Sequence, residues 1–291
     1  MGTSRSEARQ PEATNTKNEN IKNLVQLVDH IDFMSKGGPL TETALIILGH
    51  GSTKNSQSSL ATRSLAEEIR ERGIFAEVHA AFWKEEPEFN KVFELVSCED
   101  VYIVPHFISE GYFTQDVIPR EFDLDGKLTL RDDFCIRYCE PVGNHPGMTD
   151  LLLSRAREVA VGVDPAEISL LVLGHGTERN DESARAVCEQ VKKIENGVDG
   201  FGEVIGVYLD EPPRLEDWYQ LTKFENVVVL PYFIAEGLHF SRDLLKMLGL
   251  ESGASGQAYE IRSRKVYCAS PVGGDLAMAD MVIDQVRGFE S

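Results

Sequence analysis

One tetrapeptide, Leu-Gly-His-Gly, occurs twice in the chain, at residues 48–51 and again at residues 173–176. Each copy ends a short, continuously apolar run, which is typical of a strand that is buried on both faces of a parallel sheet. The glycines allow a sharp turn where the strand ends, and the polar residues that follow begin a helix. His50 and His175 are therefore predicted at the carboxyl ends of central strands, which is where open α/β sheets bind ligands.

Other segments of the chain recur in the same order as the tetrapeptide. The matched pairs are 77–83 with 203–209, 101–105 with 227–231, 105–111 with 231–237, and 141–143 with 271–273. Matches in one consistent order indicate that the chain contains an internal duplication. We therefore predict a polar tail with a short amphipathic helix at 1–42, an N-terminal domain at 43–162 and a C-terminal domain at 163–291.

The first half alternates predicted strands with predicted helices, and the second half repeats this order. Strands are expected at 44–48, 75–82, 101–105 and 135–138, and helices are expected after the first turn, at 87–95 and at 151–161. This alternation indicates βαβ units and a parallel sheet. The predicted fold class is α/β, with two tandem domains.

Charge and composition exclude several classes of function. The 291-residue chain has a net charge of −19, which repels phosphate backbones and argues against nucleic-acid binding. No apolar run approaches the roughly 20 residues that a membrane span needs, and the polar N-terminus lacks a signal-peptide core, so we expect a cytoplasmic protein without a membrane partner. The five cysteines include no CxxC pair, and we expect reduced thiols.

The tail combines two kinds of sequence. Residues 1–20 are polar and are expected to be disordered, whereas apolar residues recur at helical spacing in 21–31. We expect this amphipathic helix to dock on the body of the protein or on a partner, which leaves both a monomer and a homodimer open.

The second half brings residues that can carry chemistry to one edge of its predicted sheet. His175 follows one strand, and Glu236 and His239 follow another, so all three are predicted on one rim because parallel strands end at the same edge. Two imidazoles and a carboxylate suit the binding of a divalent transition metal or proton transfer near neutral pH.

The corresponding edge of the first half has only some of these residues. It keeps His50 and Glu110, but Phe113 occupies the position that matches His239. Two halves that face each other would therefore offer one complete wall and one incomplete wall. Phe113 either lines an apolar floor for a ligand or fills the space of a lost histidine.

These motifs resemble those of the class II tetrapyrrole chelatases. The Gly-His-Gly turns, the Pro-x-Phe-Ile-x-Glu-Gly-x-His segment at 231–239 and the Pro-Val-Gly tripeptides are most similar to CbiX-type sirohydrochlorin cobaltochelatases, in the long form with two fused copies. The resemblance covers residues 44–291. It implies two flavodoxin-like, chelatase-like domains around a central cleft that holds a tetrapyrrole. It also implies insertion of Co²⁺, Fe²⁺ or Ni²⁺, with Co²⁺ favoured, in cobalamin or sirohaem biosynthesis and without ATP or another nucleotide.

The resemblance also assigns roles to residues. The two functional histidines of the family map onto His175 and His239, whereas only His50 maps in the first half, which leaves open which wall works. The implied metal-binding residues are His175, His239 and His50, and the implied catalytic residues are His175, His239 and Glu236. A tetrapyrrole loses two pyrrole N–H protons as the metal enters, so the neutral imidazoles would present the metal and accept these protons, with Glu236 as relay or support.

Other interpretations of the same residues stay open. The alternative for the histidines is a structural role in a helix cap or loop, and for Glu236 and Glu110 it is capping of the following helix; a non-catalytic carrier of metal or tetrapyrrole would keep the same motifs. A flavodoxin-like nucleotide binder is disfavoured because no glycine-rich phosphate loop precedes a helix. His106 is expected to be a packing aromatic residue, and Cys135 and Cys139 are either buried thiols or a metal pair.

The carboxylates of a tetrapyrrole need cations or backbone N–H groups as partners. Four basic residues lie near the predicted rim, and each is otherwise a solvated surface charge: Lys54, Arg120, Arg179 and Arg242.

Overall fold

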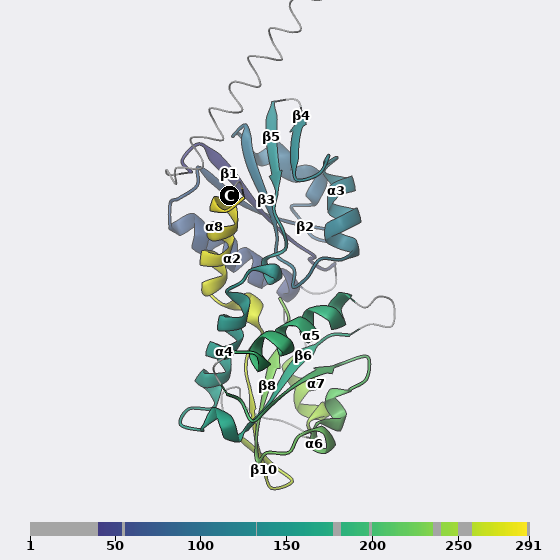
Figure 1. Cartoon of the computed structure of the whole chain (residues 1–291). Coiled ribbons are helices and arrows are strands. Elements are labelled where there is room, and N and C mark those ends of the chain that lie inside the picture. The colour runs from purple at the N-terminus through teal and green to yellow at the C-terminus, as the bar shows by residue number, and fades with distance from the viewer. Residues whose placement is uncertain are drawn as a thin grey trace, which may run out of the picture.

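The computed structural model describes residues 40–53, 56–131, 133–176, 182–197, 200–234, 240–249 and 258–289. Within them the chain forms two five-stranded sheets with helices packed on them, one in each half of the molecule (Figure 1). The prediction of two tandem α/β domains is confirmed. The predicted tail and its amphipathic helix at 21–31 lie outside the described residues. Among the described residues, no helix is both long and apolar enough to cross a membrane.

The first sheet has the strand order β2-β1-β3-β5-β4. Its strands are β1 (Thr43–Gly49), β2 (Glu77–Phe82), β3 (Asp100–Pro105), β4 (Leu128–Arg131) and β5 (Phe134–Tyr138). All seven residues of β1 are buried, as expected for a central strand covered on both faces. β2, β1, β3 and β5 run parallel, whereas the four-residue edge strand β4 is antiparallel to β5. Only this edge departs from the predicted parallel arrangement.

The second sheet repeats the first with the order β7-β6-β8-β10-β9. Its strands are β6 (Ile168–Gly174), β7 (Glu203–Tyr208), β8 (Asn226–Pro231), β9 (Tyr259–Ile261) and β10 (Arg264–Cys268). β6 is again fully buried, and β9 is again an antiparallel edge strand. The same topology in both halves is consistent with the internal repeat predicted from the sequence.

Helices connect the strands and cover the sheets. The α-helices are α2 (Leu60–Glu71), α3 (Ile118–Glu121), α4 (Met148–Val159), α5 (Glu182–Glu195), α6 (Trp218–Leu221), α7 (Phe240–Met247) and α8 (Ala277–Arg287). Shorter 3₁₀ segments are η1 (Ser56–Ser59), η2 (Phe89–Leu95), η4 (Val142–Asn144), η5 (Pro165–Glu167), η6 (Leu215–Asp217) and η7 (Val272–Gly274), and η3 (Phe113–Val117) is a π-helical turn. The helix predicted at 87–95 is thus the 3₁₀ helix η2, and the helix predicted at 151–161 is α4, which begins at Met148.

The last helix of each half packs with elements of the other half. α4, from the first half, lies against β8 and α5, whereas α8, from the second half, lies against α2 (Figure 1). One hydrophobic cluster therefore contains Leu45 and Ile47 of β1 together with Leu170 and Val172 of β6. A sheet must bury its apolar face against another layer, and here each half supplies part of that layer to the other. The boundary predicted at 162 separates the two sequence repeats. The hydrophobic core does not follow this boundary, because the last helix of each half packs against the other half.

Two ion pairs reinforce this exchange of helices. Arg72 at the end of α2 binds Asp280 of α8 at 2.5 Å, and Arg155 of α4 binds Asp275, just before α8, at 2.7 Å. Both pairs join residues from opposite halves of the sequence. The two halves are therefore held together by charge as well as by apolar packing.

Candidate functional site

The loops at the carboxyl ends of the two sheets meet where the halves join. Tyr232, directly after β8, donates a hydrogen bond from its hydroxyl to the carbonyl of Gly143 at 3.2 Å. The amide of Gly143 donates to the carbonyl of Phe107, which follows β3, at 3.0 Å. Loops from both halves are therefore in contact at this junction. This is the sheet edge at which an α/β protein binds ligands.

His50 lies at the end of β1, as predicted, and its side chain is covered on one side by aromatic residues. The Nδ1 atom is 2.9 Å from the carbonyl oxygen of Gly51. The ring of Phe113 contacts the imidazole edge-on at a centroid distance of 4.8 Å, and Phe113 itself stacks on Phe107 at 5.9 Å. Phe113 is therefore part of a packed aromatic cluster beside His50, and both interpretations of its role stay predictions.

His175 lies at the end of β6 and has a more polar setting. Its Nδ1 atom is 3.1 Å from the carbonyl oxygen of Gly176 and 3.2 Å from Oδ2 of Asp210. Both neighbours of Nδ1 are hydrogen-bond acceptors, so Nδ1 carries the proton in the neutral ring and the lone pair remains on Nε2. The side chain of His175 is 65% exposed, so a metal ion can reach it from solvent.

The convergence of His175 with Glu236 and His239 stays a prediction, because residues 235–239 lie outside the described part of the chain. Among the described residues, no group of three or more His, Cys, Asp or Glu side chains is placed to hold a metal ion. Glu110 of the first half accepts a hydrogen bond from the side-chain amide of Gln115 at 3.1 Å.

A glutamate lies under each Gly-His-Gly turn. Gly51 and Gly176 both have a positive φ, of 64° and 70°. A Cβ on Gly51 would lie 2.9 Å from Cβ of Glu85, and a Cβ on Gly176 would lie 2.8 Å from Cγ of Glu211. The second glycine of each motif is therefore required both by its backbone conformation and by the glutamate packed against it.

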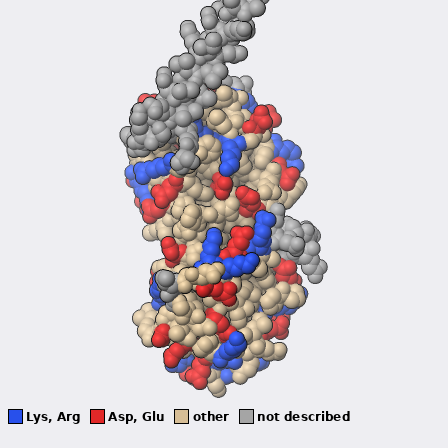
Figure 2. Space-filling view, viewed as in Figure 1, with Lys and Arg blue, Asp and Glu red and all other residues tan. Residues whose placement is uncertain are grey.

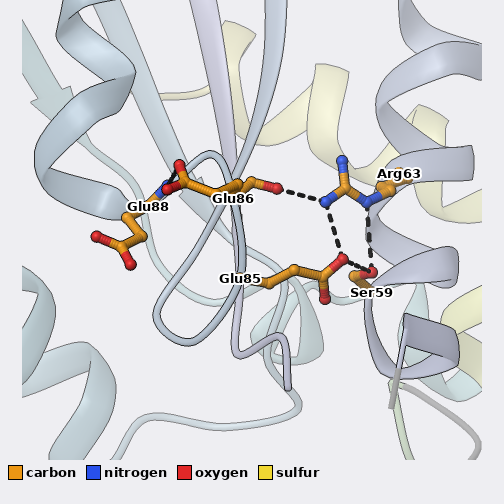
Figure 3. Close-up of polar contacts among 5 residues, drawn as sticks. All are labelled: Ser59, Arg63, Glu85, Glu86 and Glu88. Atoms are coloured by element: carbon orange, nitrogen blue, oxygen red, sulfur yellow. Dashed lines mark hydrogen bonds and ion pairs between the residues drawn. The ribbon is translucent and has the colours of Figure 1, made fainter. Parts of the chain in front are cut away.

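The glutamate of the first half is held by an arginine (Figure 3). Oε1 of Glu85 accepts hydrogen bonds from Arg63 at 3.0 Å and from the Ser59 hydroxyl at 2.7 Å. Arg63 also donates to the carbonyl of Glu86 at 2.6 Å, so it fixes the loop that follows β2. The negative charge of Glu85 is thereby compensated within the first half.

The loop after β7 in the second half is arranged differently. The backbone N–H of Asp210 donates to the carbonyl of His175 at 3.1 Å, just as the N–H of Lys84 donates to the carbonyl of His50 at 3.0 Å. The same backbone position therefore carries a carboxylate beside His175 and an ammonium group in the first half. Arg214 donates to the carbonyls of Leu209 and Asp210 and so holds the loop that carries the carboxylate. The carboxylate of Asp210 attracts a cation toward His175.

A cavity of about 370 Å³ lies between the halves. Residues 108–110, Glu140, Gly143 and Asn144 of the first half line it together with Tyr232 and one face of α5. Its floor is a chain of hydrogen bonds in which Thr149 donates to Gln190, and Gln190 donates to Tyr232. Tyr232 in turn binds Gly143. These hydrogen bonds therefore connect the first-half side of the cavity to its second-half side.

His106 is a buried residue of the first half and not part of an exposed site. Its side chain is only 2% exposed, and its Nδ1 atom is 3.0 Å from the hydroxyl of Thr62. Burial lowers the pKa of His106 to about 3, because the charged imidazolium would lose its hydration. The prediction of a packing residue agrees with this placement, which matches that of the buried Tyr232 in the second half.

Protonation of His106 is expected to make stability depend on pH. In the folded protein its pKa is about 3, whereas in the unfolded chain it is near the ordinary value of 6.5. The contribution of His106 to stability is therefore largest above pH 6.5 and falls as the pH drops toward 3, since only the unfolded chain takes up the proton. Between pH 6 and pH 5 this group should cost about 1 kcal/mol of unfolding free energy. Urea unfolding of wild type and His106→Asn at both pH values measures the difference; equal pH dependence in the two proteins would contradict it.

The two cysteines considered as a metal pair form no disulfide bond in the structure, like the other three cysteines of the chain. Cys139 is 5% exposed, and burial raises the pKa of its thiol to about 12. A thiol with such a high pKa is a poor metal ligand, because the thiolate is the form that binds metals. The buried-thiol interpretation fits Cys139.

Sequence reasoning missed three residues. These are Asp210, which lies beside His175, and the equivalent glutamates of the two halves, Glu85 and Glu211. The repeat holds a signal for them, because residues 77–83 match 203–209 and the next position reads Lys84 in one half and Asp210 in the other. The two copies therefore differ in charge at the position directly after a matched segment.

Comparison with known families identifies the repeated domain. A family model described as CbiX matches residues 44–159 and again residues 169–288. The chain belongs to the CbiX family. A relative from Halobacterium salinarum, named as a probable sirohydrochlorin cobaltochelatase, is 42% identical over 220 residues, which cover 69% of this chain and 75% of the relative. The two family matches coincide with the two halves of the repeat.

Solved structures show the same chelatase-like fold as this CbiX chain. The DR2241 protein from Deinococcus radiodurans, described as multi-domain with structural similarity to chelatases, is 28% identical with a TM-score of 0.73. The similarity covers 86% of this chain, which spans only 55% of that protein's length. SirB from Bacillus subtilis, solved with Fe³⁺, is 17% identical with a TM-score of 0.66, covering 86% of this chain and 96% of SirB. At this identity the likeness to SirB shows the fold alone.

Proposed function

We propose that this chain is a chelatase that inserts a divalent metal ion into sirohydrochlorin or a closely related tetrapyrrole. The observation that carries the proposal is the setting of His175, whose Nδ1 faces two acceptor oxygens while Nε2 keeps its lone pair. An imidazole oriented in this way is a ready ligand for Co²⁺, Fe²⁺ or Ni²⁺. The activity named for the relative that is 42% identical supports the same reaction.

The second half is proposed to carry the reaction. His175 and His239 would bind the incoming metal, and Asp210 would hold the ring of His175 through Nδ1. As the metal ion enters, two pyrrole N–H protons leave, and the imidazoles accept them, with Glu236 as relay. His50, beside Phe113 and with Lys84 on the adjoining loop, is proposed as a weak secondary contact for the metal.

Cobalt is proposed as the preferred metal because the Halobacterium relative is named a cobaltochelatase. Imidazole ligands also accept Fe²⁺ and Ni²⁺, so these ions remain substrates of the same site. No glycine-rich phosphate loop precedes a helix in the sequence, which supports a reaction without ATP. The odd number of cysteines and the lack of a CxxC pair in the sequence support a reducing, cytoplasmic setting.

The test is a metal-insertion assay with the purified chain and no nucleotide. Sirohydrochlorin is mixed without oxygen with Co²⁺, Fe²⁺ or Ni²⁺, and its absorbance change is followed with the protein and without it. We expect many turnovers per protein molecule, fastest with Co²⁺. Tight tetrapyrrole binding without turnover for any of the three metals would overturn the proposal and identify a carrier instead.

A further inference from the structure

Two cations on α5 line the cavity between the halves. Arg185 and Lys193 lie eight residues apart on α5, with Glu189 midway between them, so all three share one face of the helix. Figure 2 shows Lys and Arg side chains gathered over α5 at the junction of the halves, beside Asp and Glu side chains. The chain has a net charge of −19, so a polyanionic ligand needs local cations as partners.

Two of the three acidic residues that line the same cavity have partners outside α5. Glu140 binds Lys127 at 3.1 Å, and Glu110 accepts a hydrogen bond from Gln115 at 3.1 Å. Arg185 approaches Glu189 at 4.0 Å, which is the outer limit of an ion pair, and its side chain is 59% exposed. The guanidinium donors of Arg185 are therefore available to an incoming anion.

The cations are a feature of one half only. Thr62 of α2 and Val187 of α5 are both nearest to the first glycine of their own Gly-His-Gly turn, so they occupy equivalent positions. In this register α2 has Leu60 where α5 has Arg185, and Glu68 where α5 has Lys193. Glu68 pairs with Arg72 of its own helix. Two cations thus stand on α5 where α2 has an apolar and an acidic residue, which favours contact of the α5 face with an anion.

We propose that Arg185 and Lys193 bind carboxylate groups on the periphery of the tetrapyrrole substrate. This proposal rests on the chelatase function proposed above, since sirohydrochlorin carries carboxylate side chains around its ring. The cavity of about 370 Å³ is near the small end of the range for ligand pockets, so it suits the edge of the ring and its side chains rather than the whole macrocycle. The hydrogen-bonded floor of Gln190, Tyr232 and Gly143 holds α5 in place for this contact.

The rim cations considered from the sequence are weaker candidates. Arg120 is already paired with Glu121 at 3.1 Å. Lys54 and Arg179 lie outside the described residues, as does the side chain of Arg242. Within the described part of the chain, Arg185 and Lys193 are the cations that line the cavity between the halves.

The test measures binding of metal-free sirohydrochlorin by absorbance titration, at low and at high salt. The variants are Arg185→Gln, Lys193→Gln and the double variant. The matched control is Lys192→Gln, which removes an exposed charge from the same helix but does not line the cavity. We expect Kd to rise about fivefold for each single variant and about twentyfold for the double variant at low salt, with a smaller difference at high salt.

Kinetic measurements and a modified ligand test whether Arg185 and Lys193 contact the carboxylates of the substrate in particular. In the double variant we expect a higher KM for the tetrapyrrole, with kcat and the KM for Co²⁺ within about twofold of wild type, because the cations contact neither the metal nor the pyrrole nitrogens. Fully methyl-esterified sirohydrochlorin should bind wild type and the double variant equally. A double variant that binds sirohydrochlorin like the Lys192→Gln control would overturn the proposal. A wild-type protein that neither binds nor metallates sirohydrochlorin would instead overturn the proposed function.

Discussion

Replacement of His175 by alanine is expected to lower the rate of metal insertion by about 100-fold or more, whereas replacement of His50 by alanine should change it less than about threefold. His175 offers an Nε2 lone pair to the metal and has a carboxylate, Asp210, on its other ring nitrogen. His50 has the ring of Phe113 against its imidazole at 4.8 Å and a lysine, Lys84, on the neighbouring loop. The two histidines are equivalent in the repeat but not in their chemical surroundings.

The measurement is the initial rate of Co²⁺ insertion into sirohydrochlorin for wild type and both variants. Far-UV circular dichroism and thermal melting show whether each variant is folded; both histidines are exposed, so we expect little change. A large loss in His50→Ala with normal activity in His175→Ala would place the reaction on the first half and refute the proposed assignment. Equal losses in the two variants would show that both walls act on the substrate.

Replacement of Gly143 by alanine is expected to cost about 3 kcal/mol of unfolding free energy or more, the largest effect on stability that we predict. A Cβ at this position would lie 1.8 Å from the carbonyl oxygen of Ile108, a backbone atom that cannot move aside alone. Gly143 also accepts the hydrogen bond from Tyr232 that joins the two halves. The substitution therefore disturbs both the loop at the carboxyl end of the first sheet and the contact between the two halves.

The chain supplies both a replicate and a control for this substitution. Gly273 occupies the equivalent position in the second half, and its Cβ would lie 1.8 Å from the carbonyl oxygen of Ile234, so Gly273→Ala should be destabilising to a similar degree. At Gly274, the next residue, a Cβ would have no atom within 4 Å and the φ is not positive, so Gly274→Ala should be nearly neutral. Urea unfolding measures all three. If Gly143→Ala were as stable as Gly274→Ala, the close backbone contact would be refuted.

The Pro-Val-Gly tripeptides thus acquire a structural explanation. From the sequence they served only as landmarks of the repeat and of the family resemblance. In the structure each glycine packs its Cα against the backbone of the loop that follows β3 or β8, and its amide donates to a carbonyl in the same loop. A backbone contact this close admits no side chain, which is why glycine stands at both positions.

The central strands were predictable because their signal is local. β1 and β6 are continuously apolar and fully buried, so their identity could be read from a few adjacent residues. The edge strands β4 and β9 carry no such signal, since they have only four and three residues and are partly exposed. The 3₁₀ helix η2 was predicted as an ordinary helix because both kinds of helix bury residues at similar spacing.

The sequence alone determined the duplication, the α/β class, the family resemblance and the positions of His50 and His175 at strand ends. These features depend on residues that are adjacent in the chain or on a comparison of the chain with itself. Tertiary structure decided that α4 and α8 cross between the halves, that Asp210 lies beside the ring of His175, and that α5 presents cations to a cavity between the halves. Each of these features brings together groups that are distant in the sequence, and their contact depends on how folded elements pack, which no local pattern of residues encodes.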